Sequence, residues 1–133
     1  MIEKEEIAKA CEKCRNAMMA IHVAGPHEEW VEMTLPIFYR NGTVAAVFVY
    51  PDDNEEHVAV NDGGDIARRQ RLTKEEIESL CKRYDLEHSF IYEGDDSPCD
   101  CDIYKVVELR KMQKAVFDIA VAIVESCHMK KKA

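Results

Sequence analysis

Apolar residues recur at intervals of three and four along the first part of the chain, which is the spacing of one face of an α-helix. This stripe predicts a helix over residues 2–22 that ends before Gly25 and Pro26. Cys11 and Cys14 form a C-x-x-C pair, but both fall on the apolar stripe in the middle of the predicted helix. We therefore expect two packed thiols, with a metal-binding or redox pair as the less favoured alternatives.

The pattern then changes to alternation of apolar and polar residues, which predicts β-strands. Pro36 marks an end or an edge of the first strand. Asn41-Gly42 is a strong hairpin signal, because both residues tolerate a positive φ. Three antiparallel strands follow one another in this prediction and form a meander. They are residues 30–35, 43–50 and 57–60.

Helical signals return in the second half of the chain. A short helix could open at Asp65, and Thr73 with Glu76 matches a capping box at the start of a helix that reaches Tyr84. Residues 89–93 form a candidate short strand, and a long helix is expected from about Ile103 onward. The predicted core contains Ile7, Cys11, Val47, Val49, Val60, Leu80, Ile119 and Ile123.

Together these elements predict an α+β fold. An N-terminal helix is followed by a three-stranded antiparallel meander, a helical segment and a long C-terminal helix, with the helices packed on one face of the sheet. The length of 133 residues is typical of a single domain, so we expect residues 1–133 to share one core.

Composition places the chain among globular proteins, since 47% of its residues are hydrophobic. No apolar stretch reaches the roughly 18 residues that a membrane-spanning helix requires. The charged start of the chain does not have the pattern of a signal peptide. We therefore expect a cytoplasmic location without a membrane partner, where the six cysteines are reduced thiols.

The net charge of −8 is unevenly distributed. Residues 41–67 and 85–102 contain many acidic residues and no Lys or Arg. An acidic protein is repelled by nucleic acid, so direct nucleic-acid binding is not expected. The acidic stretches are either solvated loops or a face that binds a partner protein with a basic surface. The candidate partner-binding residues are Asp52, Asp53, Asp95, Asp96, Asp100 and Asp102.

The most distinctive local motif is Asn61-Asp62-Gly63-Gly64-Asp65. Two glycines permit a backbone shape with exposed N–H groups, but the carboxylates of Asp62 and Asp65 would oppose a phosphate. No Lys follows at the P-loop position. Asp62, Gly63, Gly64 and Asp65 are therefore either a ligand site, such as one for a divalent cation, or a strand-to-helix turn with an Asp cap, which we favour.

Cysteine and histidine give weaker signals. Cys99 and Cys101 lie among acidic residues and could hold a structural metal with Cys127-His128, although an ordinary loop is the simpler interpretation. Cys81 and His88 are the best available nucleophile–base pair, but they match no known motif. We therefore assign no catalytic residue, no metal site and no cofactor.

The strand that ends at residues 34–37, the strands at 43–50 and 58–60, the motif at 61–65 and two further helices form one recognisable order. This order resembles domain of unknown function eighteen-twenty-eight, a small family of uncharacterised bacterial and phage proteins. Asn61 stands where Ser, Thr or Asp is expected in that family. The resemblance implies a phage or mobile-element setting and transfers no catalytic residue.

Three functions follow from the sequence. The favoured one is a non-enzymatic acidic protein that inhibits a host nucleic-acid-handling or defence complex through protein–protein contact, by analogy with small acidic anti-CRISPR proteins. The first alternative is a metal- or small-ligand-binding enzyme that uses the Asp62–Asp65 turn. The second is an oligomeric structural module, with a homodimer as the simplest case.

Overall fold

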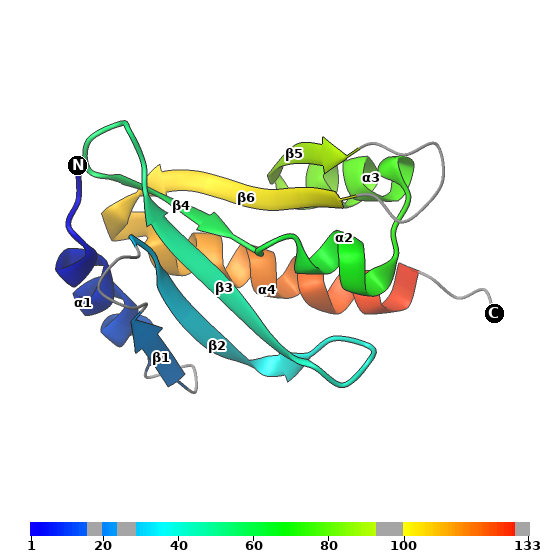
Figure 1. The fold of residues 1–133 in the computed structure, drawn as a ribbon, viewed down its shortest axis with the longest axis horizontal. Coiled ribbons are helices and arrows are strands. Elements are labelled where there is room, and N and C mark those ends of the chain that lie inside the picture. Colours follow the sequence, from blue (N-terminus) through cyan, green and yellow to red (C-terminus); the bar gives the residue numbers. More distant parts are fainter. Residues whose placement is uncertain (16–19, 24–28, 93–99, 130–133) are drawn as a thin grey trace.

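The computed structural model describes residues 1–15, 20–23, 29–92 and 100–129. It is an α+β fold in which helices cover one face of an antiparallel sheet (Figure 1). The helices are α1 (Lys4–Arg15), α2 (Asp65–Gln70), α3 (Lys74–Tyr84), the 3-10 helix η1 (Leu109–Lys111) and α4 (Met112–Met129). The strands are β1 (Ala20–Val23), β2 (Val31–Phe38), β3 (Val44–Pro51), β4 (His57–Asn61), β5 (Glu87–Tyr92) and β6 (Asp100–Glu108).

The strands form one sheet in the order β1-β2-β3-β4-β6-β5, and every neighbouring pair is antiparallel. β4 is the short strand at the centre and ends at Asn61, whereas β3 and β6 both extend beyond it. The chain then enters α2, which follows the end of β4 and contacts β6 and α4 (Figure 1). α2 therefore occupies the place where β4 would continue.

The hydrophobic core lies between the sheet and the helices α1, α3 and α4. Alternate residues of each strand face it, such as Val31, Met33 and Leu35 of β2, all of which are fully buried. α4 crosses behind the sheet and contacts β2, β3, β4 and β6 (Figure 1). Seven of the eight predicted core residues are buried, and the eighth, Cys11, has a side chain outside the described ones.

Several local predictions are confirmed. Gly42 has a φ of 91° in the hairpin between β2 and β3. The capping box is present, because the Thr73 hydroxyl accepts from the Glu76 N–H while the Glu76 carboxylate accepts from the Thr73 N–H. Pro36 does not end the strand as predicted, because β2 continues to Phe38; it lies at an irregularity of the pairing with β3, beyond the part of β2 that pairs with β1. Turn and cap chemistry is local, which is why the sequence alone specifies it.

The predicted N-terminal helix over residues 2–22 is wrong in its last part. The described helix ends at Arg15, and Ala20–Val23 forms the edge strand β1, in which Val23 pairs with Val31 of β2. Ile21 and Val23 are β-branched residues that suit a strand, and β2 offers unpaired backbone groups to them. The spacing of apolar residues along the sequence carries no information about this pairing with β2.

The predicted start of the last helix at about Ile103 is also wrong. The predicted antiparallel meander of three strands is present as β2, β3 and β4, and three further strands extend it to a sheet of six. Asp100–Glu108 forms β6, which inserts between β4 and β5, and α4 begins only at Met112. The β-branched and aromatic residues Ile103, Tyr104 and Val106 favour a strand, and two neighbouring strands satisfy both of its edges. None of the helices in the described ranges is long and apolar enough to cross a membrane.

Candidate functional site

Asp62 is fully buried, and its carboxylate is surrounded by backbone donors. One oxygen, Oδ1, accepts from the N–H groups of Gly64 at 2.8 Å and of Ile103 at 3.0 Å. The other oxygen, Oδ2, accepts from the N–H of Ile66 at 2.8 Å, in the first turn of α2. The carboxylate therefore joins β4, α2 and β6. The N-cap residue of α2 is Gly64, which has no side-chain cap, and the Asp62 carboxylate accepts from the first turn of the helix instead.

Burial raises the pKa of Asp62 to about 7. The backbone hydrogen bonds from Ile103, Ile66 and Gly64 act in the opposite direction, and the nearby charge of Asp102 raises the pKa further. Because Asp62 has no exposed surface and both of its oxygens face N–H donors, the residue serves the fold and is poorly placed to hold a cation.

The two glycines of the motif have separate reasons to be glycine. Both have a positive φ, 73° at Gly63 and 79° at Gly64. A Cβ on Gly63 would lie 2.6 Å from Cε2 of Phe48, so the Phe48 ring lies directly against this turn. The last residue of the motif, Asp65, is at the surface, where its carboxylate pairs with Arg68 at 2.8 Å. Neither glycine nor Asp65 forms a cavity for a ligand.

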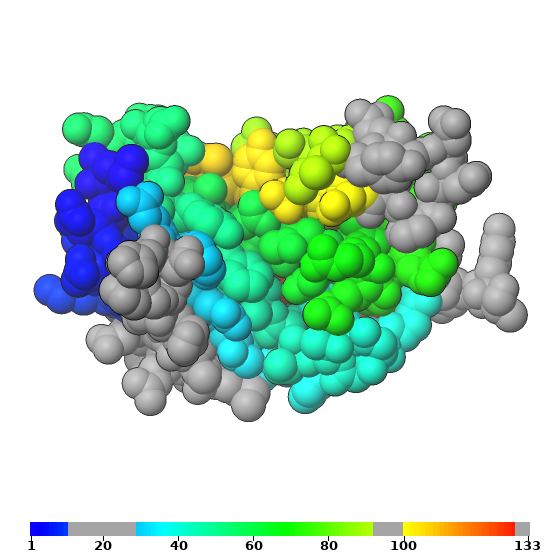
Figure 2. Space-filling model, in the orientation of Figure 1, coloured from blue at the N-terminus to red at the C-terminus, as the bar shows by residue number. Residues whose placement is uncertain are grey.

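The helices α1, α3 and α4 pack on one face of the sheet, and Figure 2 views the molecule from the opposite side, on which the described residues place none of these three helices. We call this opposite face of the sheet the open sheet face. Its outward residues come from five strands and are half-buried or exposed. They include Glu32, Thr34, Ala46, Phe48, Tyr50, Ala59, Asn61, Glu87, Ser89, Asp102, Tyr104 and Val106. None of the described outward residues of β2 to β6 is a Lys or Arg.

One row of directly paired residues crosses the open sheet face. The pairs of the register are Glu32–Phe48, Phe48–Asn61, Asn61–Tyr104 and Tyr104–Glu87. The row continues onto β1, where His22 pairs with Glu32. From β2 to β5 it has Glu32 and Glu87 at its two ends, an aromatic ring next to each of these carboxylates, and an amide in the centre. Trp30 and Tyr50 stack beside it with ring centroids 5.9 Å apart. Aromatic and acidic side chains thus share one surface.

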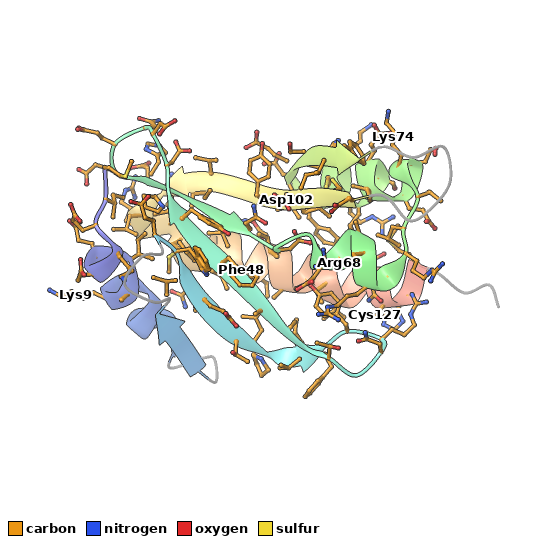
Figure 3. The ribbon with its side chains drawn as sticks, in the orientation of Figure 1. Lys9, Phe48, Arg68, Lys74, Asp102 and Cys127 are labelled. Atoms are coloured by element: carbon orange, nitrogen blue, oxygen red, sulfur yellow. The ribbon has the colours of Figure 1, made fainter. Side chains whose placement is uncertain are left out.

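Asp62 also positions part of this face. The N–H of Ile103 donates to the Asp62 carboxylate, and the Asp62 N–H donates to the Ile103 carbonyl at 2.9 Å. Ile103 faces the core, so its neighbours Asp102 and Tyr104 project from the open sheet face. Figure 3 labels Asp102, Phe48 and Arg68 around the middle of this face. The buried Asp62 carboxylate therefore holds the part of the β6 backbone that carries the half-buried carboxylate of Asp102.

The predicted acidic surface is only partly assembled. Asp100 and Asp102 lie at the start of β6, whereas Asp52 and Asp53 lie in the turn between β3 and β4, near the other end of β6. A strand rises about 3.3 Å per residue, which separates these two groups by roughly 25 Å. Asp95 and Asp96 lie outside the described residues.

Sequence reasoning missed Glu32, Phe48, Tyr104 and Glu87, which the register places in one row across the open sheet face. Their signal is the outward position in each alternating strand. That signal becomes usable only when residues 100–108 are assigned to a strand, because the register then aligns Tyr104 with Glu87.

The predicted metal loop does not converge in the described residues. Cys101 is fully buried and faces the core, on the side of β6 opposite to Asp102. Burial raises the pKa of its thiol to about 12. Cys127 lies at the far end of α4, where its Sγ is 3.0 Å from Nε2 of Gln70. Within the described ranges, no group of three His, Cys, Asp or Glu residues could hold a metal ion, and Cys99 lies outside them.

The candidate nucleophile Cys81 is unsuited to catalysis. Its side chain is buried, and burial together with the charge of Asp62 raises the pKa of the thiol to about 12, so the thiolate is scarce at neutral pH. The ring of His88 packs edge-on against Phe90, with a centroid distance of 5.2 Å. The side chains of Cys11 and Cys14 are outside the described ones.

A surface hollow of about 650 Å³ lies at the opposite end of the molecule from α2. Glu6 and Lys9 of α1, Glu108 of β6 and Arg110 contribute to its lining, and Glu108 pairs with Arg110 at 3.2 Å. Charges of both signs therefore meet there. None of the residues predicted to bind a partner or a ligand lines this hollow.

Comparison of the chain with protein-family models, with curated proteins and with solved structures found no match. The function is therefore inferred from the residues of the chain itself.

Proposed function

We propose that this chain is a non-enzymatic acidic binding protein whose open sheet face contacts a partner protein with a basic surface. One observation carries the proposal. The described outward residues of five neighbouring strands include aromatic rings and carboxylates but no Lys or Arg. Most sheets that expose one face to water are polar there. An uncovered face with Phe48, Tyr50 and Tyr104 supports a contact surface.

Electrostatics supports a basic partner over a neutral one. The chain has a net charge of −8, so its field attracts a positively charged surface over several ångströms and repels nucleic acid. Glu32, Glu87 and Asp102 have no ion-pair partner among the described residues. Three carboxylates of the face are therefore available to cations of another protein.

The partner in this proposal is a host complex that handles nucleic acid or acts in defence, and the chain is encoded by a phage or another mobile element. Proteins that bind nucleic acid present basic grooves to phosphates. Carboxylates displayed on a sheet have the same sign of charge as phosphates, so they occupy such a groove in their place. Phe48 and Tyr104 add apolar contact. The contact takes place in the cytoplasm, where nucleic-acid-handling complexes operate.

The test is a pull-down of the tagged protein from a lysate of its native host, identified by mass spectrometry and repeated with two charge-matched variants. The first variant reverses the open sheet face with Glu32→Lys, Glu87→Lys and Asp102→Lys. The second makes the same change in charge on the helical side with Glu5→Lys, Glu75→Lys and Glu78→Lys, all of which are exposed on α1 and α3.

We expect the wild-type protein and the helical-side variant to recover a nucleic-acid-handling complex, and the open-face variant to lose it. Raising the salt from about 0.1 M to about 0.5 M should weaken the wild-type interaction, because exposed charges are screened. Recovery of the same complex by the open-face variant would contradict the proposed surface. Recovery of the bait alone by all three proteins would contradict the proposed partner.

Self-association is a second candidate role, supported by the outer side of α4. Phe117 and Val124 of α4 are 62% and 44% exposed, and they lie seven residues apart, which places them on one side of the helix. Sedimentation equilibrium tests this role. A dimer in the wild-type protein that Phe117→Glu dissociates would support it, and a wild-type monomer would refute it.

A further inference from the structure

Tyr104 is a residue of the open sheet face with two carboxylate residues as neighbours, one on the next strand and one on its own strand. Glu87 is its direct partner on β5, and paired residues on one face have Cβ atoms about 4.5–5.5 Å apart. Asp102 precedes it by two residues on the same face of β6, at about 7 Å. We call Glu87, Asp102 and Tyr104 the tyrosine cradle.

The charges in the cradle act on the tyrosine itself. Desolvation raises the pKa of Tyr104, and the charges of Glu87 and then Asp102 raise it further. The phenol therefore stays neutral, and its ring keeps the electron-rich face that attracts a cation. The two carboxylates lie close enough to the ring to influence it, which supports a common site for one positive group.

Bases of the chain itself are engaged elsewhere. Lys105 follows Tyr104, but its Nζ bonds to the Asp85 carboxylate at 3.0 Å and to the Asp85 carbonyl at 2.8 Å. Arg68 lies near Asp102 across Gly64, but its Nη2 donates to Asp65 at 2.8 Å. Neither Glu87 nor Asp102 has an ion-pair partner among the described residues, so the cradle has acceptors without an internal cation.

We propose that the tyrosine cradle binds one arginine side chain of the partner protein, and this inference rests on the proposed function. A planar guanidinium stacks on a tyrosine ring and still presents donors at its edges to carboxylates on two sides. A lysine ammonium is a compact, strongly hydrated charge that gains less from the ring face. Arginine is thereby selected over lysine at this position.

The backbone beneath the cradle is fixed before a partner arrives. Asp62 exchanges two hydrogen bonds with Ile103, which lies between Asp102 and Tyr104. On the other side, Glu87 belongs to β5, whose pairing with β6 aligns it with Tyr104. A site that is ordered in the free protein binds its ligand with a smaller loss of conformational entropy.

The experiment compares two short Gly/Ser-spaced peptides that carry equal numbers of arginines or of lysines. Each peptide is titrated into the isotope-labelled chain at low salt, and the amide signals and dissociation constants are measured. We expect signals of Glu87, Asp102 and Tyr104 to shift, and the arginine peptide to bind about fivefold more tightly than the lysine peptide.

Variants separate the contribution of the Tyr104 ring to peptide binding from that of the two carboxylates. Tyr104→Leu should abolish the preference for arginine while leaving the affinity for the lysine peptide unchanged. Tyr50→Leu is the matched control, because Tyr50 is an aromatic residue of the same face whose register partner on β4 is Ala59, and its loss should leave the preference intact. Glu87→Gln with Asp102→Asn should weaken both peptides.

Equal affinities of the two peptides, or a preference for arginine that survives Tyr104→Leu, would overturn the arginine site. If the double amide variant still weakened both peptides, the acidic open sheet face of the proposed function would remain supported. If neither peptide shifted signals on the open sheet face, both the cradle and the basic-partner proposal would be wrong. The folded state of each variant is checked from its unshifted amide signals.

Discussion

Asp62 directly follows β4, Asp102 lies on the neighbouring strand β6, and the two residues have opposite roles. The Asp62 carboxylate is fully buried and accepts from three backbone N–H groups. The Asp102 carboxylate is half-buried on the open sheet face and has no ion-pair partner in the described ranges. One aspartate is saturated by its own chain, and the other is available to another molecule.

This difference separates carboxylates that stabilise the fold from those that are available for binding. Burying a carboxylate is costly unless donors surround it, so an aspartate such as Asp62 is tolerated only where the backbone is arranged for it. An exposed aspartate has no such requirement and adds little to stability. The number of acidic residues in a segment therefore says little about which of them contact a partner.

The largest expected effect is that of Asp62→Ala on stability. The substitution leaves three buried N–H groups without an acceptor, and each costs roughly 1–3 kcal/mol, so we expect the free energy of unfolding to fall by about 4 kcal/mol. Urea unfolding followed by circular dichroism measures the change. Asp102→Ala is the control and should change the free energy of unfolding by less than about 0.5 kcal/mol. Equal losses in the two variants would remove the distinction between these aspartates.

The pH dependence of stability gives the next largest effect. The Asp62 carboxyl has an ordinary pKa of about 3.9 in the unfolded chain, and a pKa of about 7 in the folded protein. Between these values the unfolded state has released a proton that the folded state retains, so stability falls as the pH rises. The contribution of the Asp62 carboxyl to stability is complete below its pKa in the unfolded chain. It is lost as the pH rises through its pKa in the folded protein.

For one proton, the free energy of unfolding should fall by about 2 kcal/mol between about pH 5 and about pH 7. The measurement is the difference in this fall between the wild-type protein and Asp62→Asn, which keeps the acceptor oxygen but does not titrate. Glu108, whose pKa is lowered by Arg110, has its effect at lower pH. The same pH profile in both proteins would show that Asp62 is not the titrating group.

Gly63→Ala tests the contact between the turn and the open sheet face. The added Cβ would lie 2.6 Å from the Phe48 ring, at a residue whose φ is 73°. We expect a loss of about 1.5 kcal/mol, from the backbone conformation and the displaced ring together. Gly42→Ala is matched, because its φ is 91° but no atom lies within 4 Å of the added Cβ. An equal loss at both glycines would mean that Phe48 moves freely.

The smallest effect concerns the cap of helix α3, at the surface. The Thr73 hydroxyl accepts from the Glu76 N–H at 3.2 Å in a half-buried position, so water can replace it. Thr73→Ala should lower the free energy of unfolding by about 1 kcal/mol, well below the loss for Asp62→Ala. Thermal melts of the two variants, measured side by side, rank the two sites. A larger loss of stability in Thr73→Ala than in Asp62→Ala would contradict the idea that the buried hydrogen bonds contribute more than the half-buried ones.

Elements whose chemistry is local could be predicted from the sequence. The hairpin at Gly42, the cap at Thr73 and the turn at Asp62 are all fixed by a few adjacent residues. Elements that depend on distant partners could not be predicted. Residues 103–108 carry an apolar pattern compatible with a helix, and they become a strand because β4 and β5 lie on either side.

The candidate site shows the same division. Asp102 could be named from its acidic neighbourhood, but Tyr104 could not, because it was assigned to a helix and its pairing with Glu87 was unknown. Asp52 and Asp53 were grouped with it although they lie near the other end of β6. A functional surface on a sheet consists of residues that are distant in sequence, so its composition depends on the register.

The position of β6 in the sheet also determines the order in which the chain can fold. β6 lies between β4 and β5 and follows both in the sequence, and α4, which covers the core side, follows β6. During synthesis, β4 and β5 emerge before the strand that joins them, and α4, which covers β2, β3, β4 and β6, is the last described element to be made. The pairing of β4 with β6 is non-local, and such pairing favours slow folding.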